Sequence, residues 1–111
     1  MRGESLARKY LCRSGYRIID RNYRLGRQEI DLIARLKNRV VFIEVKTRIK
    51  TADSQRENPL TPRQNKGLKK AIAAYCLKNR FNLDLIRFDL IIILVDRHWI
   101  NATLKHYRDI F

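Results

Sequence analysis

The sequence predicts a single α/β domain over residues 1–111, a mixed β-sheet flanked by helices in the order α-β-β-β-α-β. A chain of 111 residues can form one hydrophobic core but not two, which favours one domain. Two segments with helical spacing of apolar residues alternate with short runs rich in β-branched residues. Residues 86–95 (IRFDLIIILV) are almost continuously apolar, which is typical of a strand covered on both faces at the centre of a sheet.

The first half of the chain contains one predicted helix and three predicted strands. Residues 4–14 carry apolar residues on one side, and Gly15 is placed to end this helix. The following segments are rich in β-forming residues and are expected to form strands at residues 16–24, 28–36 and 39–47. The polar pair Lys37-Asn38 joins the last two strands, which predicts a hairpin.

The second half contains the predicted second helix. Residues 49–60 are polar and lack periodicity, so we expect a loop there. The helix is expected to begin with Thr61 as N-cap, with Pro62 at the first helical position and Gln64 completing a capping box. Its buried stripe is predicted to consist of Leu68, Ala71, Ile72, Tyr75 and Cys76. Beyond the long apolar strand, residues 98–102 could add a final strand.

The charge balance indicates a polyanionic partner. The chain has 25 Lys and Arg residues against 11 Asp and Glu residues, a formal net charge of +14. Nucleic acid is therefore the expected partner. A basic surface that serves solubility alone and an anionic membrane surface are the weaker alternatives.

The sequence carries no sign of a membrane segment or a metal-binding cysteine cluster. No stretch approaches the roughly 18 apolar residues that span a bilayer, and the opening residues lack an apolar signal core. We therefore expect a soluble, cytoplasmic protein. Cys12 and Cys76 are isolated from each other, which suggests neither a zinc site nor a disulfide framework.

The segment VVFIEVKTR at residues 40–48 carries two charges on one face of a predicted strand. Strand alternation places Glu44 and Lys46 in the same row as the apolar residues before them. A buried charge without a partner is strongly unfavourable, so these groups need opposite charges, a metal or solvent nearby. Asp31, in the preceding strand, supplies a second carboxylate that the hairpin could bring close to Glu44.

Two neighbouring carboxylates and an ammonium group form a set suited to metal-assisted hydrolysis. Because two carboxylates repel each other, they favour a hard divalent cation with oxygen ligands, such as Mg²⁺. The Lys46 ammonium beside such a cation can orient or deprotonate water and stabilise charge on a phosphate group. Together with the basic surface, these groups suggest phosphodiester hydrolysis.

The order of these segments resembles the PD-(D/E)XK nuclease superfamily, and specifically the YraN family of predicted Holliday-junction-resolvase-like endonucleases. The resemblance covers most of the chain. The segments that carry it are Gly3-Glu4, Leu11, Gly15-Tyr16-Arg17-Ile18, Arg21-Asn22-Tyr23-Arg24, EIDLIA at residues 29–34, residues 42–48 and Arg87-Phe88-Asp89.

This resemblance implies a restriction-endonuclease-like core and a set of site residues. Asp31, Glu44 and Val45 would hold Mg²⁺, with Mn²⁺ as a substitute, Lys46 would be the catalytic lysine, and Glu4 would reach the site from the first helix. DNA, including branched or junction DNA, would be the substrate, and the protein could form a homodimer. The sequence differs from the family pattern in having Gln28 and Gln64 where a glycine and a lysine are usual, and in lacking a glycine before Leu60.

Several residues have structural explanations beside the functional ones. Glu44 and Lys46 could instead form a solvated strand face with an ion pair to Asp31. Glu4 could act only through the helix dipole. Glu29 is a third metal ligand or a charge partner of neighbouring arginines. Gln64, the other secondary candidate, could point at the site or only cap its helix.

The remaining polar and aromatic residues receive other interpretations. Asp89, inside the buried strand, is expected to form a structural salt bridge with an arginine such as Arg87 or Arg21. His98 and His106 are given no role, and Trp99 is expected to be a core residue and not a base-stacking group. The basic residues expected to contact phosphates are Arg48, Lys50, Arg63, Lys66 and Lys70.

The leading hypothesis is therefore a Mg²⁺-dependent DNA endonuclease. The main alternative is a non-catalytic nucleic-acid-binding module on a nuclease fold, which would bind in a salt-sensitive way without cleavage. A protein that binds an anionic membrane or the ribosome surface is a third and weaker alternative.

Overall fold

The computed structural model describes residues 2–51 and 66–110 of the chain. The elements follow in the order α1 (Arg2–Arg13), β1 (Arg17–Leu25), β2 (Gln28–Leu36), β3 (Arg39–Ile49), α2 (Lys66–Asn79), the 3₁₀ turn η3 (Leu83–Leu85), β4 (Ile86–Val95) and β5 (Ala102–Tyr107). The predicted α/β class is confirmed, and the order is α-β-β-β-α-β-β, since β5 is a strand in its own right.

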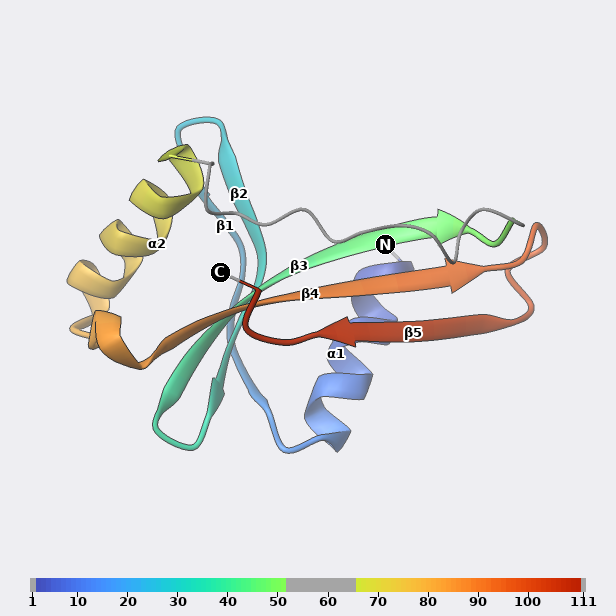
Figure 1. Cartoon of the computed structure of the whole chain (residues 1–111), viewed down its shortest axis with the longest axis horizontal. Helices are drawn as coiled ribbons and strands as arrows, with labels where there is room; N and C mark the ends of the chain where they lie inside the picture. The colour runs from blue at the N-terminus through green and yellow to red at the C-terminus, as the bar shows by residue number, and fades with distance from the viewer. Residues whose placement is uncertain (1, 52–65, 111) are drawn as a thin grey trace.

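The five strands form one mixed sheet in the order β1-β2-β3-β4-β5 (Figure 1). The first three strands pair antiparallel, β3 and β4 pair parallel, and β5 returns antiparallel to β4. The parallel pair requires a crossover connection, and α2 lies within it. This arrangement is compatible with a restriction-endonuclease-like core.

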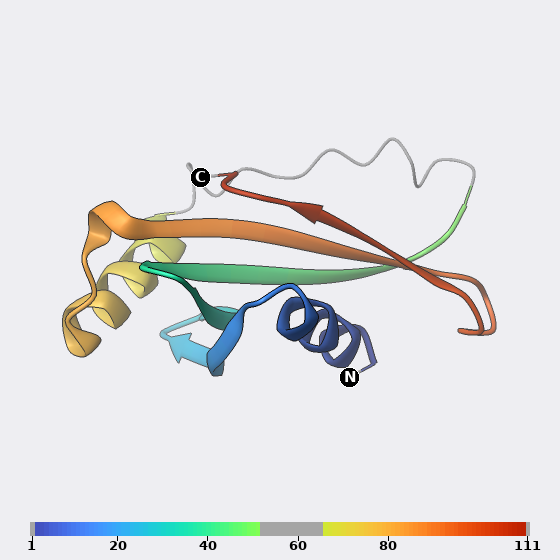
Figure 2. The same ribbon diagram turned by 90° about the horizontal axis from the view of Figure 1, so that it is seen from below.

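The helices pack on opposite faces of the sheet and toward different ends of it (Figures 1 and 2). Alternate residues of β3 face the two helices: Val41 and Ile43 join the core under α1, while Val40 and Phe42 join the core under α2. Residues 88–95 of β4 are all buried, as expected for a strand at the centre of a sheet. Neither described helix is long and apolar enough to cross a membrane.

Two predicted strand boundaries are wrong for tertiary reasons. The third strand extends to Ile49 and not to residue 47, because the parallel ladder with β4 continues to the pair Ile49–Val95. The last strand occupies Ala102–Tyr107 and not residues 98–102. Trp99 has a positive φ of 58° and belongs to a tight turn, a conformation that an extended strand does not contain.

The other elements lie close to their predicted positions. The strands predicted at residues 28–36 and 86–95 are confirmed at both ends, and α1 and β1 are shifted by one or two residues. The predicted stripe of α2 is buried as a whole. The capping residues Thr61 and Pro62 lie outside the described residues.

Candidate active site

The β2–β3 hairpin opens at the point where the predicted site residues lie. The antiparallel ladder runs from the pair Leu36–Arg39 to the pair Leu32–Ile43 and ends there. Continuing this register by one residue would set Asp31 opposite Glu44. Beyond Ile43, β3 continues beside β4 alone among the described strands. The two carboxylates therefore stand at an opening in the sheet.

Asp31 turns its side chain into this opening. Its Oδ2 accepts a hydrogen bond from the backbone N–H of Val45 at 2.8 Å. Because the N–H and C=O of one strand residue point to the same edge, the carbonyl oxygen of Val45 faces the same opening. A carboxylate and a backbone carbonyl are thus available side by side as oxygen donors.

A hollow of about 300 Å³ lies at this position, which we call the Asp31 hollow. It brings together four of the predicted site residues, Glu4, Asp31, Val45 and Lys46, with Arg48 at its margin; its full lining is Glu4, Asp31, Val45, Lys46, Thr47 and Arg48. Residues from α1, β2 and β3 therefore converge here, and Glu4, Asp31 and Lys46 line one hollow.

Glu4 reaches the hollow because α1 approaches β3 very closely. A Cβ atom added to Gly3 would lie 2.1 Å from the Thr47 hydroxyl oxygen, so only glycine fits at this contact. Glu4, the next residue, is half-buried beside the strand. The Gly3-Glu4 pair thus combines a close helix–sheet contact with a carboxylate directed at the site.

The environment of Asp31 disfavours the ionised form of its carboxyl group. Burial raises the pKa of its carboxyl group, and the carboxylates of Glu44, Glu29 and Glu4 raise this pKa further; the hydrogen bond from Val45 acts in the opposite direction. The pKa is therefore above its ordinary value. A cation placed beside Asp31 would relieve this repulsion.

Glu44 lies in a neighbouring hollow and not in the Asp31 hollow. It is exposed, and it lines a smaller cavity of about 70 Å³ on the α2 side of the sheet together with Gln28, Glu29, Leu68 and Phe88. Its position in the row of Val40 and Phe42 agrees with the predicted alternation. Its charge still acts on Asp31 across the strand edge.

The described residues contain no group of three or more acidic, histidine or cysteine side chains that could hold a metal ion. Mg²⁺, however, is usually bound by one or two carboxylates and keeps several waters. Asp31, Glu44 and the Val45 carbonyl supply two carboxylates and one neutral oxygen in a region of excess negative charge. This donor set fits a hard divalent cation.

The other candidate residues are placed as follows. Glu29 forms an ion pair with Arg24 at 2.8 Å, so the interpretation as a charge partner of an arginine has a structural basis. Gln28 packs against α2, where a Cβ on Gly67 would lie 2.6 Å from its side-chain nitrogen. Three predicted phosphate contacts, Lys50, Lys66 and Lys70, are exposed. The candidates Arg63 and Gln64 lie outside the described residues.

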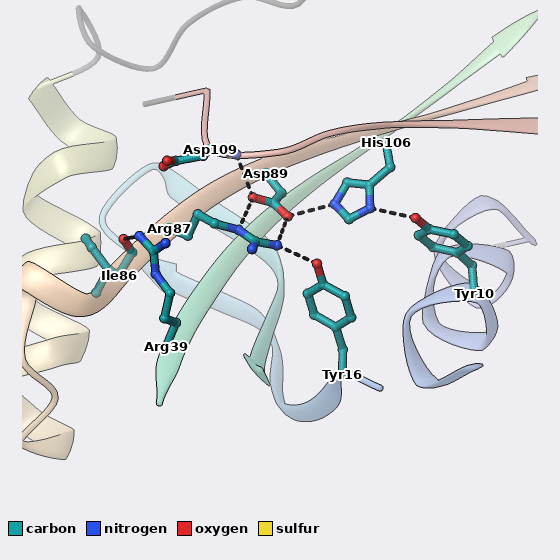
Figure 3. Close-up of polar contacts among 8 residues, drawn as sticks. All are labelled: Tyr10, Tyr16, Arg39, Ile86, Arg87, Asp89, His106 and Asp109. Atoms are coloured by element: carbon teal, nitrogen blue, oxygen red, sulfur yellow. Dashed lines mark hydrogen bonds and ion pairs between the residues drawn. The ribbon is translucent and has the colours of Figure 1, made fainter. Parts of the chain in front are cut away.

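A second polar cluster surrounds Asp89 on β4 (Figure 3). Arg87 donates two hydrogen bonds to the Asp89 carboxylate, at 2.9 and 2.8 Å, which confirms the predicted salt bridge. The ring of His106 lies 2.7 Å from the same carboxylate and 2.7 Å from the hydroxyl of Tyr10. Arg87 also donates to the hydroxyl of Tyr16.

Sequence reasoning missed most of this Asp89 cluster. His106 was given no role, although its side chain is 4% exposed and paired on both ring nitrogens. The segments around Tyr16 and around Arg87 and Asp89 had been singled out by the family resemblance, and the structure shows that they touch. No sequence signal connected His106 to them, since the contact depends on how β5 pairs with β4.

Comparison with known proteins identifies close relatives along most of the chain. The model of "Uncharacterised protein family UPF0102" matches residues 3–93. A UPF0102 protein of Chlorobium phaeobacteroides is 43% identical over 95 residues, covering 86% of this chain and 75% of the relative. A UPF0102 protein of Syntrophomonas wolfei is 39% identical, covering 90% and 92%. A third, from Chlorobium limicola, is 41% identical, covering 98% and 88%.

Proposed function

We propose that this chain, which belongs to the uncharacterised protein family UPF0102, is a metal-dependent endonuclease that hydrolyses phosphodiester bonds in DNA. The family membership agrees with the resemblance drawn from the sequence but carries no activity with it. The proposal rests on the site geometry and on the charge of the chain.

The observation that carries the proposal is the composition of the Asp31 hollow. A half-buried carboxylate stands at an open strand edge among other carboxylates, and Lys46 lines the same hollow. This concentration of negative charge lies in a protein with a formal net charge of +14. A local anionic site on a cationic surface suits a cation that works on a bound polyanion.

The residues of the Asp31 hollow would have different roles in the reaction. A divalent cation such as Mg²⁺, held by Asp31, Glu44 and the Val45 carbonyl, would activate water and neutralise charge on the phosphate. The Lys46 ammonium would orient the attacking water and stabilise negative charge that develops on the phosphate oxygens. Arg48, at the margin of the hollow, is placed to hold a neighbouring phosphate group.

Cleavage assays on two variants test this proposal. Lys46→Ala and Glu44→Ala should each reduce Mg²⁺-dependent cleavage of branched or flapped DNA by at least about 100-fold. Both should retain the circular dichroism spectrum of the wild type, because neither residue is part of the buried core. Lys78→Ala, an exposed lysine at the end of α2, is the matched control and should cleave normally. Unchanged cleavage by Lys46→Ala would contradict the proposal.

A non-catalytic nucleic-acid-binding module remains the second candidate. The observation in its favour is that Glu44 lines a different hollow from Asp31 and Lys46. A module of this kind would bind DNA in a salt-sensitive manner, would show no cleavage with Mg²⁺ or Mn²⁺, and would bind neither ion at Asp31.

A further inference from the structure

The turn between β4 and β5 presents large apolar side chains at the surface. Ile100 is 77% exposed and Trp99 is 37% exposed. Ile49, at the end of β3, is 54% exposed and pairs with Val95, the last residue before this turn. The prediction that Trp99 belongs to the core is therefore wrong. We call Ile49, Trp99 and Ile100 the apolar tip.

The turn that carries the apolar tip is held in one conformation by Asp96. The Asp96 carboxylate accepts the backbone N–H groups of Ile100 at 2.8 Å and Asn101 at 3.1 Å, and its carbonyl accepts the N–H of Trp99 at 3.1 Å. The N–H of Asp96 in turn donates to the carbonyl of Asn101 at 3.1 Å. The exposure of the apolar side chains is thus fixed by hydrogen bonds, which lowers the entropy cost of binding a partner.

Exposed basic residues lie next to the apolar tip in the sequence. Arg97 belongs to the same turn, and Arg48 and Lys50 flank Ile49 at the end of β3; all three are exposed. The backbone N–H of Lys50 donates to the carbonyl of Val95 at 2.7 Å, which ties the end of β3 to the start of the turn. The carboxylate of Asp96, the acidic residue of the turn, already accepts hydrogen bonds from backbone N–H groups.

The apolar tip and the candidate active site share strand β3. β3, β4 and β5 run together past α1 to this turn (Figures 1 and 2). Lys46 and Ile49 are three residues apart on β3, so about 10 Å separates their Cα atoms at roughly 3.3 Å per residue. That distance is about three base-pair steps at roughly 3.4 Å each. Strand alternation sets the two side chains on opposite faces of β3, so a DNA molecule that contacts both must approach the edge of β3 that lies open beyond Ile43 among the described strands.

We propose that the apolar tip is a second DNA-contacting surface, which stacks Trp99 on an unpaired base and so directs the enzyme to DNA with unstacked bases beside the cleaved bond. The inference rests on the proposed function, since it names the substrate class of the same site. Exposed aromatic side chains ringed by cations are the usual platform for unpaired bases, and apolar side chains inserted at base steps separate them. Three side chains, two at this turn and one at the end of β3, are too few for the broad apolar face that membrane binding requires.

Trp99 is the sole tryptophan of the chain, so its own fluorescence reports on this contact. The experiment uses the full chain carrying Lys46→Ala, in EDTA, titrated with a flapped DNA and with a fully paired duplex of the same length. Stacking on a base should quench Trp99 emission with the flapped DNA more than with the duplex. Flapped DNA that binds, as followed by anisotropy of a labelled strand, without changing Trp99 emission would overturn the inference. A blue shift of Trp99 emission with anionic vesicles but not with DNA would also overturn the inference.

Substitutions separate stacking from general attraction to DNA. Trp99→Ala should weaken binding of labelled flapped DNA by about 5- to 100-fold and binding of the duplex by less than about twofold. Trp99→Phe should restore most of the affinity, because phenylalanine also stacks on bases. Leu77→Ala, at an 83% exposed apolar residue of α2, is the control and should bind as the parent does. Equal losses on both DNAs for Trp99→Ala would overturn the inference.

This experiment also separates the inference from the proposed function. Binding is measured without divalent metal and in a variant that lacks the proposed catalytic lysine. A protein that never cleaves DNA can still show the fluorescence change, and a protein that cleaves DNA can fail to show it.

Discussion

Asp31 and Asp89 are two aspartates of the same sheet in opposite electrostatic surroundings. Asp89 is 0% exposed and is paired with Arg87, His106 and the backbone N–H of Asp109. Burial acts to raise its pKa, but these hydrogen bonds outweigh burial and hold the pKa below its ordinary value. Asp31 has one backbone donor, and burial together with three nearby carboxylates raises its pKa.

The difference indicates that the two carboxylates serve different ends. The Asp89 cluster is complete within the chain, and it ties α1, the connection from α1 to β1, β4 and β5 together (Figure 3). Asp31 lowers stability in its ionised form, because burial and three nearby carboxylates disfavour its negative charge. A fold that keeps such a group generally does so at a functional site. We therefore interpret Asp89 as structural and Asp31 as a group that binds a cation.

Removal of the cation beside Asp89 should have the largest effect on stability. Arg87→Met leaves a buried carboxylate without the guanidinium group that donates two hydrogen bonds to it, and should lower the free energy of unfolding by about 3–5 kcal/mol, measured by urea denaturation. Arg24→Met is the matched control, because the Arg24–Glu29 pair has the same 2.8 Å distance but side chains that are 75% and 35% exposed. Arg24→Met should lower the free energy of unfolding by no more than about 1 kcal/mol.

The effect of Arg87→Met should also depend on pH. The pKa of Asp89 is lowered in the folded state, so its stabilising contribution is present above the unfolded pKa of about 3.9 and is lost as the pH falls through the lower folded value. The difference in free energy of unfolding between the wild type and Arg87→Met should therefore become smaller at acidic pH. If Arg87→Met lowered the free energy of unfolding at pH 7 by no more than Arg24→Met does, the Asp89 cluster would not be a main source of stability.

Removal of the charge of Asp31 should have a smaller effect of the opposite sign. Asp31→Asn keeps an acceptor for the Val45 N–H but removes the repelled charge, so the metal-free variant should be more stable than wild type at pH 7, by up to about 1 kcal/mol. The pKa of Asp31 is raised in the folded state, so the cost of its charge is present at neutral pH. This cost disappears as the pH falls below the unfolded pKa of about 3.9.

Thermal unfolding in EDTA at pH 7 and at pH 3.5 measures the difference in stability between Asp31→Asn and the wild type. Asp84→Asn, which removes an exposed carboxylate from η3, controls for the general effect of net charge on a basic protein. A metal-free Asp31→Asn variant that unfolds more easily than wild type at pH 7 would show that Asp31 is a structural group after all.

The sequence was a good guide wherever local pattern decides structure. The strands at residues 28–36 and 86–95 follow from their composition, and the hairpin register follows from the two-residue connection between β2 and β3. That register is also why the proximity of Asp31 to Glu44 could be predicted. The Arg87–Asp89 pair was predictable because a buried acid needs a cationic partner.

Other features depend on contacts between segments far apart in the chain, which local pattern does not report. The β2–β3 ladder ends just before Asp31, and Glu44 lines a different hollow from Asp31. His106 meets Tyr10 across 96 positions of sequence. The exposure of Trp99 results from the turn that Asp96 closes, although the residue type alone suggested the core.

A metal site at Asp31 is tested most directly by calorimetric titration of the wild-type chain with Mn²⁺, the substitute for Mg²⁺, beside Asp31→Asn. The wild type should bind Mn²⁺ with an affinity that weakens as the pH falls and protons compete for Asp31, whereas Asp31→Asn should bind no ion at this site. Equal Mn²⁺ binding by the two proteins, or no binding by the wild type, would rule out this metal site.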